Sequence, residues 1–152
     1  MSKTGTRLDP SQPDILDSPL FAYGTLQIDS VLHTLLGRVP SKSAAQLVGW
    51  RAVRLPERPY PGLVPQSNHI AAGHLLTGLS PAEWALLDRF EDPDYDLLQV
   101  EVDGQTASAY AWRKNFLDLD WNLERFVEDE LPAYVERCAT WLARDRAAAA
   151  TT

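Results

Sequence analysis

The chain has 152 residues, of which 45% are hydrophobic, and it carries a formal net charge of −7. This length and composition predict one globular domain with a sizeable buried core. Because the chain is acidic and has no cluster of Lys and Arg, phosphate backbones and anionic lipid surfaces should repel it. We therefore expect neither nucleic acid nor a membrane as a partner.

The single cysteine, Cys138, excludes an internal disulfide and any metal cluster built from cysteines. Its helical spacing from Tyr134, Trp141 and Leu142 predicts a small buried packing residue rather than a nucleophile. The three histidines show no zinc-type spacing, so we expect no metal site.

Both ends of the chain lack a hydrophobic period. Residues 1–17 are polar and contain proline, which predicts a tail without regular structure, and residues 147–152 should fray. The folded domain should then span residues 18–146. Because no apolar run reaches the roughly 20 residues that cross a bilayer, and the start has no signal-like apolar segment, we expect a cytoplasmic protein.

The first half of the chain predicts a strand, a helix and two more strands. Residues 19–23 form an apolar run that ends at Gly24, and a helical period follows, capped by Asp29 or Ser30 and ended by Gly37. Beyond that helix the expected elements are a strand at 44–55 with a possible bulge at Gly49, a proline-rich loop at 56–65, and a strand at 69–76.

The second half begins with the clearest local signal, Ser80-Pro81-Ala82-Glu83, which is typical of a helix start with a capping box. The helix should end near Glu91. Strands at 97–102 and 107–112, joined by a hairpin turn at Asp103-Gly104, precede a helix over 122–146 that is kinked or split at Pro132. This order predicts an α+β fold with an antiparallel-rich, strongly curved sheet.

Two segments have residues suited to chemistry. The turn Tyr23-Gly24-Thr25-Leu26 joins a strand to a helix, where unpaired backbone N–H groups can bind an anion or a developing oxyanion, although such turns are often only structural. The segment 88–96 contains five carboxylates, which can form a solvated acidic loop. Negative charge is unfavourable at a helix C-terminus, however, and Glu91 follows the core-facing Phe90, so Glu91 is a candidate general base at a pocket edge.

Several motifs, in order, resemble those of the gamma-glutamylcyclotransferase-like family, in its AIG2-like branch. They are Leu20-Phe21-Ala22-Tyr23-Gly24-Thr25-Leu26, Tyr60-Pro61-Gly62-Leu63, Gly73-His74-Leu75-Leu76, Leu87-Asp88-Arg89-Phe90-Glu91 with Tyr95, and Ala109-Tyr110-Ala111-Trp112. The similarity spans residues 20–112, and residues 121–126 are also similar to AIG2-like tails.

The resemblance implies a small curved or barrel-like mixed sheet with flanking helices around a pocket. It implies that Glu91 is the general acid and base, that no metal or organic cofactor is needed, and that the ligand is a small gamma-glutamyl compound. The substrate's α-amine would attack its own gamma-carbonyl, closing 5-oxoproline and releasing an amine. The substrate-binding residues implied are Tyr23, Gly24, Thr25, Leu26, Pro61, Gly62 and Tyr95.

This chain departs from the family pattern at Asp92 and Asp96, where the family often has Gly and Arg. Extra negative charge at a pocket mouth predicts a preference for neutral or cationic gamma-glutamyl-amines over an acidic leaving group, such as the Cys-Gly half of glutathione. The pattern leaves the amine half of the substrate and the oligomeric state open.

Two hypotheses without catalysis remain. One is a small-molecule binding or regulatory module that uses the same pocket without turnover. The other is an interaction domain that docks through its tryptophan-rich C-terminal helix. The presence of Glu91 favours the enzyme, because a binder needs no base beside an amide-binding turn.

Overall fold

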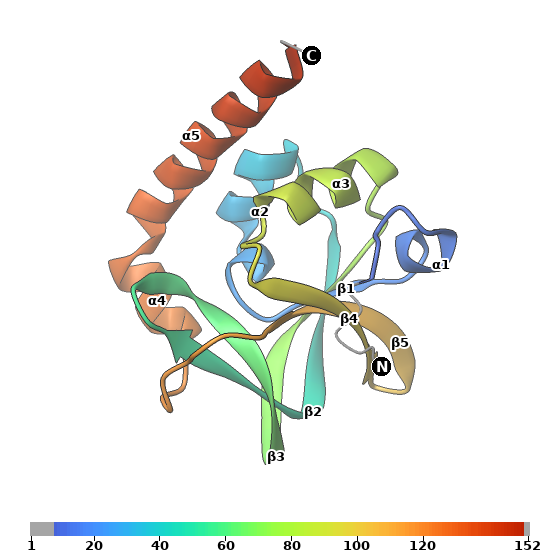
Figure 1. Cartoon of the computed structure of the whole chain (residues 1–152), viewed down its shortest axis with the longest axis vertical. Helices are drawn as coiled ribbons and strands as arrows, with labels where there is room; N and C mark the ends of the chain where they lie inside the picture. Colours follow the sequence, from blue (N-terminus) through green and yellow to red (C-terminus); the bar gives the residue numbers. More distant parts are fainter. Residues whose placement is uncertain (1–7, 151–152) are drawn as a thin grey trace.

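A five-stranded sheet in the order β2-β3-β1-β5-β4 forms the centre of the computed structural model, which describes residues 8–150 (Figure 1). The strands β1 and β5 are parallel, and the other neighbouring pairs are antiparallel. The sheet curves until its edge strands β2 and β4 approach each other, so the predicted α+β class with a curved mixed sheet is confirmed. The strands are β1 (Leu20–Ala22), β2 (Ser41–Leu55), β3 (Arg58–Thr77), β4 (Tyr95–Val102) and β5 (Gln105–Trp112).

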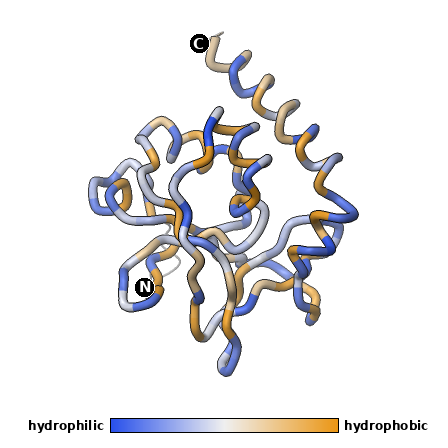
Figure 2. Tube along the Cα trace, turned by 180° about the vertical axis from the view of Figure 1, so that it is seen from behind, coloured by the Kyte–Doolittle hydropathy of each residue, from blue (hydrophilic) through white to orange (hydrophobic). Residues whose placement is uncertain are grey.

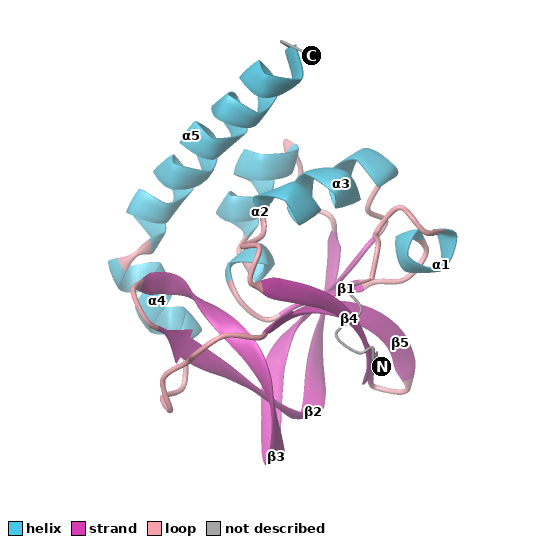
Figure 3. Cartoon of the chain, viewed as in Figure 1, coloured by secondary structure: helices cyan, strands magenta, loops and turns pink. Residues whose placement is uncertain are grey.

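Helices flank this sheet, as Figure 3 shows. They are α1 (Pro13–Leu16), α2 (Asp29–Leu36), α3 (Pro81–Phe90), α4 (Leu123–Asp129) and α5 (Leu131–Ala150), with a short 3-10 turn at Thr25–Gln27. The predicted C-terminal helix is split at Glu130, with Pro132 in the first turn of α5. Part of α5 packs on α2, and its C-terminal end projects past the rest of the molecule.

Alternate residues along β1 and the following Tyr23 enter two different hydrophobic cores. Leu20 and Ala22 belong to the core between the sheet and the helices, whereas Phe21 and Tyr23 belong to the core enclosed by the curved sheet. This follows from the two-residue side-chain period of a strand buried on both faces. Helix α5 contributes to the first core through Tyr134 and Cys138, and hydrophilic and hydrophobic residues alternate along it (Figure 2), as expected of a helix packed on one side.

Several local predictions are confirmed. Ser80 and Glu83 form a complete capping box at the start of α3, and Gly37 ends α2 in the left-handed conformation. Asp103 and Gly104 both have positive φ between β4 and β5, as a two-residue hairpin turn requires. Residue Ile28, rather than Asp29 or Ser30, caps α2, so that helix begins earlier than predicted.

The predicted loop at 56–65 is wrong, because the long strand β3 begins at Arg58 and includes three prolines of that segment. A turn at 56–57 joins β2 directly to β3. This part of β3 pairs with β2, whereas β1 pairs with β3 only around Leu75. A strand segment that pairs on one side only tolerates proline, because the N–H groups on its other side are not needed for sheet hydrogen bonds.

The prediction of an unstructured segment at 1–17 is wrong for the residues that the structure describes. The backbone N–H of Leu8 donates to the carbonyl of Leu97 at 2.9 Å, and α1 buries Ile15, which is 3% exposed. Leu8 and Leu16 pack against the same core as Ile15, so these few apolar side chains anchor a segment that is too short to show a period. Residues 1–7 lie outside the described part. At the other end, α5 is helical through Ala150, so residues 147–150 do not show the predicted fraying.

Candidate active site

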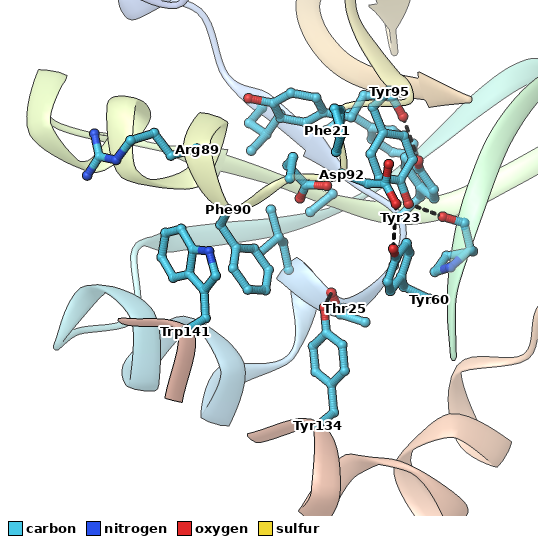
Figure 4. Close-up of a pocket in the computed structure, with 18 of the residues that line it drawn as sticks. Phe21, Tyr23, Thr25, Tyr60, Arg89, Phe90, Asp92, Tyr95, Tyr134 and Trp141 are labelled. Carbon is cyan, nitrogen blue, oxygen red and sulfur yellow. Dashed lines mark hydrogen bonds between the residues drawn. The ribbon is translucent and has the colours of Figure 1, made fainter. Parts of the chain in front are cut away.

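All five tyrosines of the chain line one cavity of about 330 Å³. The cavity lies beside the end of β1, and its walls come from β1, β3, α3, β4, β5 and α5. Figure 4 shows the aromatic rings that surround it, with Tyr134 reaching in from α5 toward Thr25. A cavity of this volume matches a small molecule.

The turn Tyr23-Gly24-Thr25-Leu26 forms one wall of the cavity. A 3-10 turn at Thr25–Gln27 lies between β1 and α2. The N–H groups at the start of such a turn have no carbonyl of a preceding turn to bind. Gly24 has a φ of −126° and a ψ of −128°, a combination outside the main α and β regions. The glycine is required for another reason: a β-carbon at this position would lie 2.7 Å from Cγ of Pro61.

Glu91 also lines the cavity, immediately after the last residue of α3. The capping box sets where α3 starts, and the N–H of Glu91 closes its last turn by donating to the carbonyl of Leu87 at 3.0 Å. The chain then turns to an extended conformation, with Glu91 at φ −65° and ψ 146°. This ending places Glu91 between the helix and the start of β4, where it is partly buried.

The tyrosines around Glu91 are held by their hydroxyl groups. Tyr23 donates to the carbonyl of Tyr110 at 2.5 Å, and Tyr95 donates to the carbonyl of Pro61. The hydroxyl groups of Tyr134 and Thr25 lie 3.3 Å apart. These bonds fix the rings, which form a rigid apolar wall.

Burial raises the pKa of Tyr23 and of Tyr95 well above the usual value, and the negative charge of Glu91 raises both further. Burial also raises the pKa of Tyr134, again with a contribution from Glu91. One carboxylate therefore acts electrostatically on three of the surrounding tyrosines. Because these phenols stay protonated at neutral pH, they can donate hydrogen bonds but are poor bases.

Asp92 also lines the cavity, but its carboxylate is occupied. It accepts hydrogen bonds from Tyr60 at 2.6 Å and from Arg58 at 3.1 Å, and its side chain is only 12% exposed. Burial would raise the pKa of Asp92, yet the hydrogen bonds from Tyr60, the Asp94 amide and Arg58 hold that pKa below its usual value. The pKa of Tyr60 rises to about 12 through burial and its bond to Asp92.

The other acidic side chains of segment 88–96 have partners too, so the interpretation of this segment as a solvated loop is wrong. Asp88 accepts a hydrogen bond from Tyr110 at 2.7 Å. Asp96 lies 3.7 Å from Arg113, and Asp94 lies 3.8 Å from Arg58. The negative charge predicted at the mouth is therefore largely offset by arginines.

Seven of the eight residues proposed from the sequence meet at this cavity: Tyr23, Gly24, Thr25, Leu26, Pro61, Glu91 and Tyr95. Gly62 packs instead against Trp112, whose Cβ lies 2.6 Å from where a β-carbon at Gly62 would stand. The roles of these residues in binding and catalysis stay predictions.

Sequence reasoning missed the lining residues Tyr110, Tyr134, Arg137 and Trp141, and gave Tyr60 no role. Tyr134, Arg137 and Trp141 are on α5, far from the matched motifs, and their only signal was the helical period. Trp141 packs edge-on against Phe90, with ring centroids 5.0 Å apart. This contact makes Trp141 part of the fold, which weakens the prediction of a tryptophan-rich docking face.

Comparison with known proteins agrees with this arrangement. The family model described as "Gamma-glutamyl cyclotransferase, AIG2-like" matches residues 20–130. The chain belongs to this family. AIG2-like protein C of Arabidopsis thaliana is 33% identical over 142 residues, covering 88% of this chain and 83% of the relative. AIG2-like protein B of the same plant is 29% identical over 143 residues, covering 86% and 83%.

A solution structure from Arabidopsis thaliana superposes on this fold with a TM-score of 0.60 and 28% identity, covering 79% of this chain and 87% of the other. A second solution structure from that plant gives a TM-score of 0.61 and 25% identity, covering 85% and 84%. Both neighbours support the fold described above. Within residues 8–150, no helix is both long and apolar enough to cross a membrane.

Proposed function

We propose that this protein is a cyclotransferase that converts a gamma-glutamyl-amine or gamma-glutamyl peptide to 5-oxoproline and a free amine. The observation that supports this most is the shared cavity of Glu91 and the turn Tyr23–Leu26. A base and backbone N–H donors around one cavity are what an acyl transfer to an internal amine needs.

The choice of Glu91 as the base follows from the other groups around the cavity. Asp92 already accepts hydrogen bonds from Tyr60 and Arg58, and its lowered pKa makes it a weaker base. The tyrosines have raised pKa values and stay protonated. We therefore assign the base role to Glu91.

In the proposed reaction Glu91 takes a proton from the substrate's α-ammonium group. The freed amine attacks the gamma-carbonyl carbon, and the new C–N bond closes a five-membered ring. The carbonyl oxygen becomes an oxyanion, which N–H groups of residues 24–26 stabilise by roughly 3 kcal/mol for each donor, as in other acyl transfers. The bond to the leaving nitrogen then breaks as Glu91 returns a proton to it.

The proton balance needs one carboxylate only. The attacking nitrogen loses two protons over the cycle, and the leaving nitrogen gains two when it departs as an ammonium ion. Glu91 can pass them one at a time and ends unchanged. Because nucleophile and electrophile belong to one molecule, holding the reactive conformer can contribute about 7 kcal/mol or more.

The test is an assay of 5-oxoproline release from a panel of gamma-glutamyl amines and dipeptides, with wild type and Glu91→Gln compared. Turnover by wild type and its loss in Glu91→Gln supports the proposal. Tight binding without turnover by either protein would instead favour the non-catalytic module. Equal turnover by both proteins would show that Glu91 is not the base.

A further inference from the structure

Arg137 is a charged residue on the cavity wall that the sequence motifs do not include. It lies on α5, beyond residues 20–130 that the family model matches. Its guanidinium carbon lies 5.6 Å from the ring centroid of Tyr60 and 5.7 Å from that of Tyr134. The residue is exposed.

The two rings connect Arg137 to the reactive end of the cavity. The hydroxyl of Tyr134 lies 3.3 Å from that of Thr25 in the amide-bearing turn. The hydroxyl of Tyr60 donates to Asp92, the neighbour of Glu91. Tyr134 therefore lies between Arg137 and the turn, and Tyr60 lies between Arg137 and the segment that contains the base.

Two other charged side chains of the wall, Arg89 and Asp92, already form ion pairs. Arg89 forms a two-bond ion pair with Asp145, at 2.9 and 3.0 Å, and points away from the other labelled side chains in Figure 4. Asp92 is held by Arg58. Among the ion pairs of residues 8–150, none includes Arg137. Arg137 is thus a cation beside the cavity that makes cation–π contacts with two aromatic rings and whose N–H groups can bind a ligand.

We propose that Arg137 binds a carboxylate on the amine half of the substrate, so that the protein prefers gamma-glutamyl amino acids to gamma-glutamyl derivatives of neutral or cationic amines. This inference rests on the proposed function, because it assumes that the gamma-glutamyl half occupies the inner end between Glu91 and the turn. The leaving half then extends along Tyr60 and Tyr134 toward Arg137. A guanidinium recognises a carboxylate through two parallel hydrogen bonds.

This assignment reverses the preference that the sequence suggested. Asp92 and Asp96 predicted a negative mouth, but Arg58 and Arg113 offset them. Arg137 is the cation at this wall that stays available to a ligand carboxylate.

The experiment compares two substrates that differ only in charge, gamma-glutamyl-glycine and its neutral carboxamide, gamma-glutamyl-glycinamide. Wild type should have the higher kcat/KM for gamma-glutamyl-glycine. Arg137→Gln should lower that value about 3- to 10-fold, mainly through KM, as expected for an ion pair at a partly exposed site. The value for the glycinamide should change less than about twofold, within the range of exposed pairs that contribute little.

The control is Arg144→Gln, an exposed arginine about two turns further along α5, which should leave both substrates unchanged. Arg137→Glu should lower kcat/KM for gamma-glutamyl-glycine more than Arg137→Gln does. An equal loss for both substrates would overturn the inference, because Arg137 would then bind the gamma-glutamyl half. No loss for either would overturn it as well.

Calorimetric binding of the same two compounds separates this inference from the proposed function. Suppose that neither compound is turned over, but wild type binds gamma-glutamyl-glycine more tightly than the glycinamide and Arg137→Gln binds the two equally. Arg137 then recognises the carboxylate, and only the proposed catalysis fails. If neither compound binds nor reacts, both proposals fail. Turnover of both at equal kcat/KM by wild type would refute the carboxylate preference alone.

Discussion

The ring of Pro61 occupies the space that a β-carbon on Gly24 would need. A β-carbon at residue 24 would lie 2.7 Å from Cγ and 2.8 Å from Cδ of Pro61. Two motifs nearly 40 residues apart in the chain thus meet at the wall of the cavity. The contact sets how closely the turn after β1 approaches β3.

Gly24→Ala should lower the free energy of unfolding by about 1–3 kcal/mol, because overpacking forces side chains or backbone to shift. The measurement is urea unfolding in a double-mutant cycle with Pro61→Ala, which removes Cγ and Cδ. In the Pro61→Ala background the cost of Gly24→Ala should fall by about 1 kcal/mol or more. A cost unchanged by Pro61→Ala would mean that Gly24 is needed for some other reason.

Glu91→Gln keeps the shape of the side chain but removes the base. It should lower kcat for 5-oxoproline formation by about 100-fold or more, while the affinity for substrate stays nearly the same. Asp88→Asn is the control, because Asp88 accepts a hydrogen bond from Tyr110 that an asparagine oxygen can still accept. If Asp88→Asn costs as much turnover as Glu91→Gln, the base has been misassigned.

Asp92 should stabilise the fold in a pH-dependent way. Against the effect of burial, hydrogen bonds from Tyr60 and Arg58 lower its pKa in the folded state. The stabilisation is therefore present above the unfolded-state pKa of an aspartate and is lost as pH falls through the folded-state value. Asp92→Asn should cost about 1.5–3 kcal/mol at pH 7. Urea unfolding from pH 7 to pH 3 should show the gap between wild type and Asp92→Asn closing, and a gap independent of pH would contradict this origin.

Ile15 should anchor the segment before β1. It is 3% exposed and belongs to the core beneath the helices, so Ile15→Ala should lower the free energy of unfolding by about 2–5 kcal/mol. Gln12→Ala is the control, because Gln12 is exposed and makes no side-chain cap to α1. Deletion of residues 1–17 should cost more than about 1 kcal/mol. A fully stable truncated protein would show that this contact contributes nothing.

Cys138 should be unreactive in the folded protein. Its side chain is fully buried, and burial raises its pKa to about 12, so almost no thiolate forms at neutral pH. A thiol reagent should label it only in denaturant. Thr140→Cys adds a second cysteine at an exposed position of the same helix, and this one should react at an ordinary rate in the folded state. Fast labelling of Cys138 without denaturant would mean that α5 opens readily.

Local patterns in the sequence were enough to predict the features that depend on neighbouring residues. Ser80 and Glu83 cap α3 reciprocally within one helical turn, and Asp103-Gly104 adopts the left-handed conformations of a two-residue hairpin. The turn after β1 and the position of Glu91 at the end of α3 follow from local signals of the same kind, supported by family motifs. Such signals can be read from sequence because the interacting groups are separated by a few bonds of backbone.

The three-dimensional packing was needed to show which distant groups share the cavity. Arg58 and Tyr60 occupy the Asp92 carboxylate across more than 30 residues, which turned an expected solvated acid into a buried hydrogen-bond acceptor. Tyr134 and Arg137 reach the same cavity from α5, and the prolines of residues 58–65 are placed at an edge of β3. Side chains far apart in the chain meet through the curvature of the sheet and the packing of helices, and neither depends on the local pattern of any one segment.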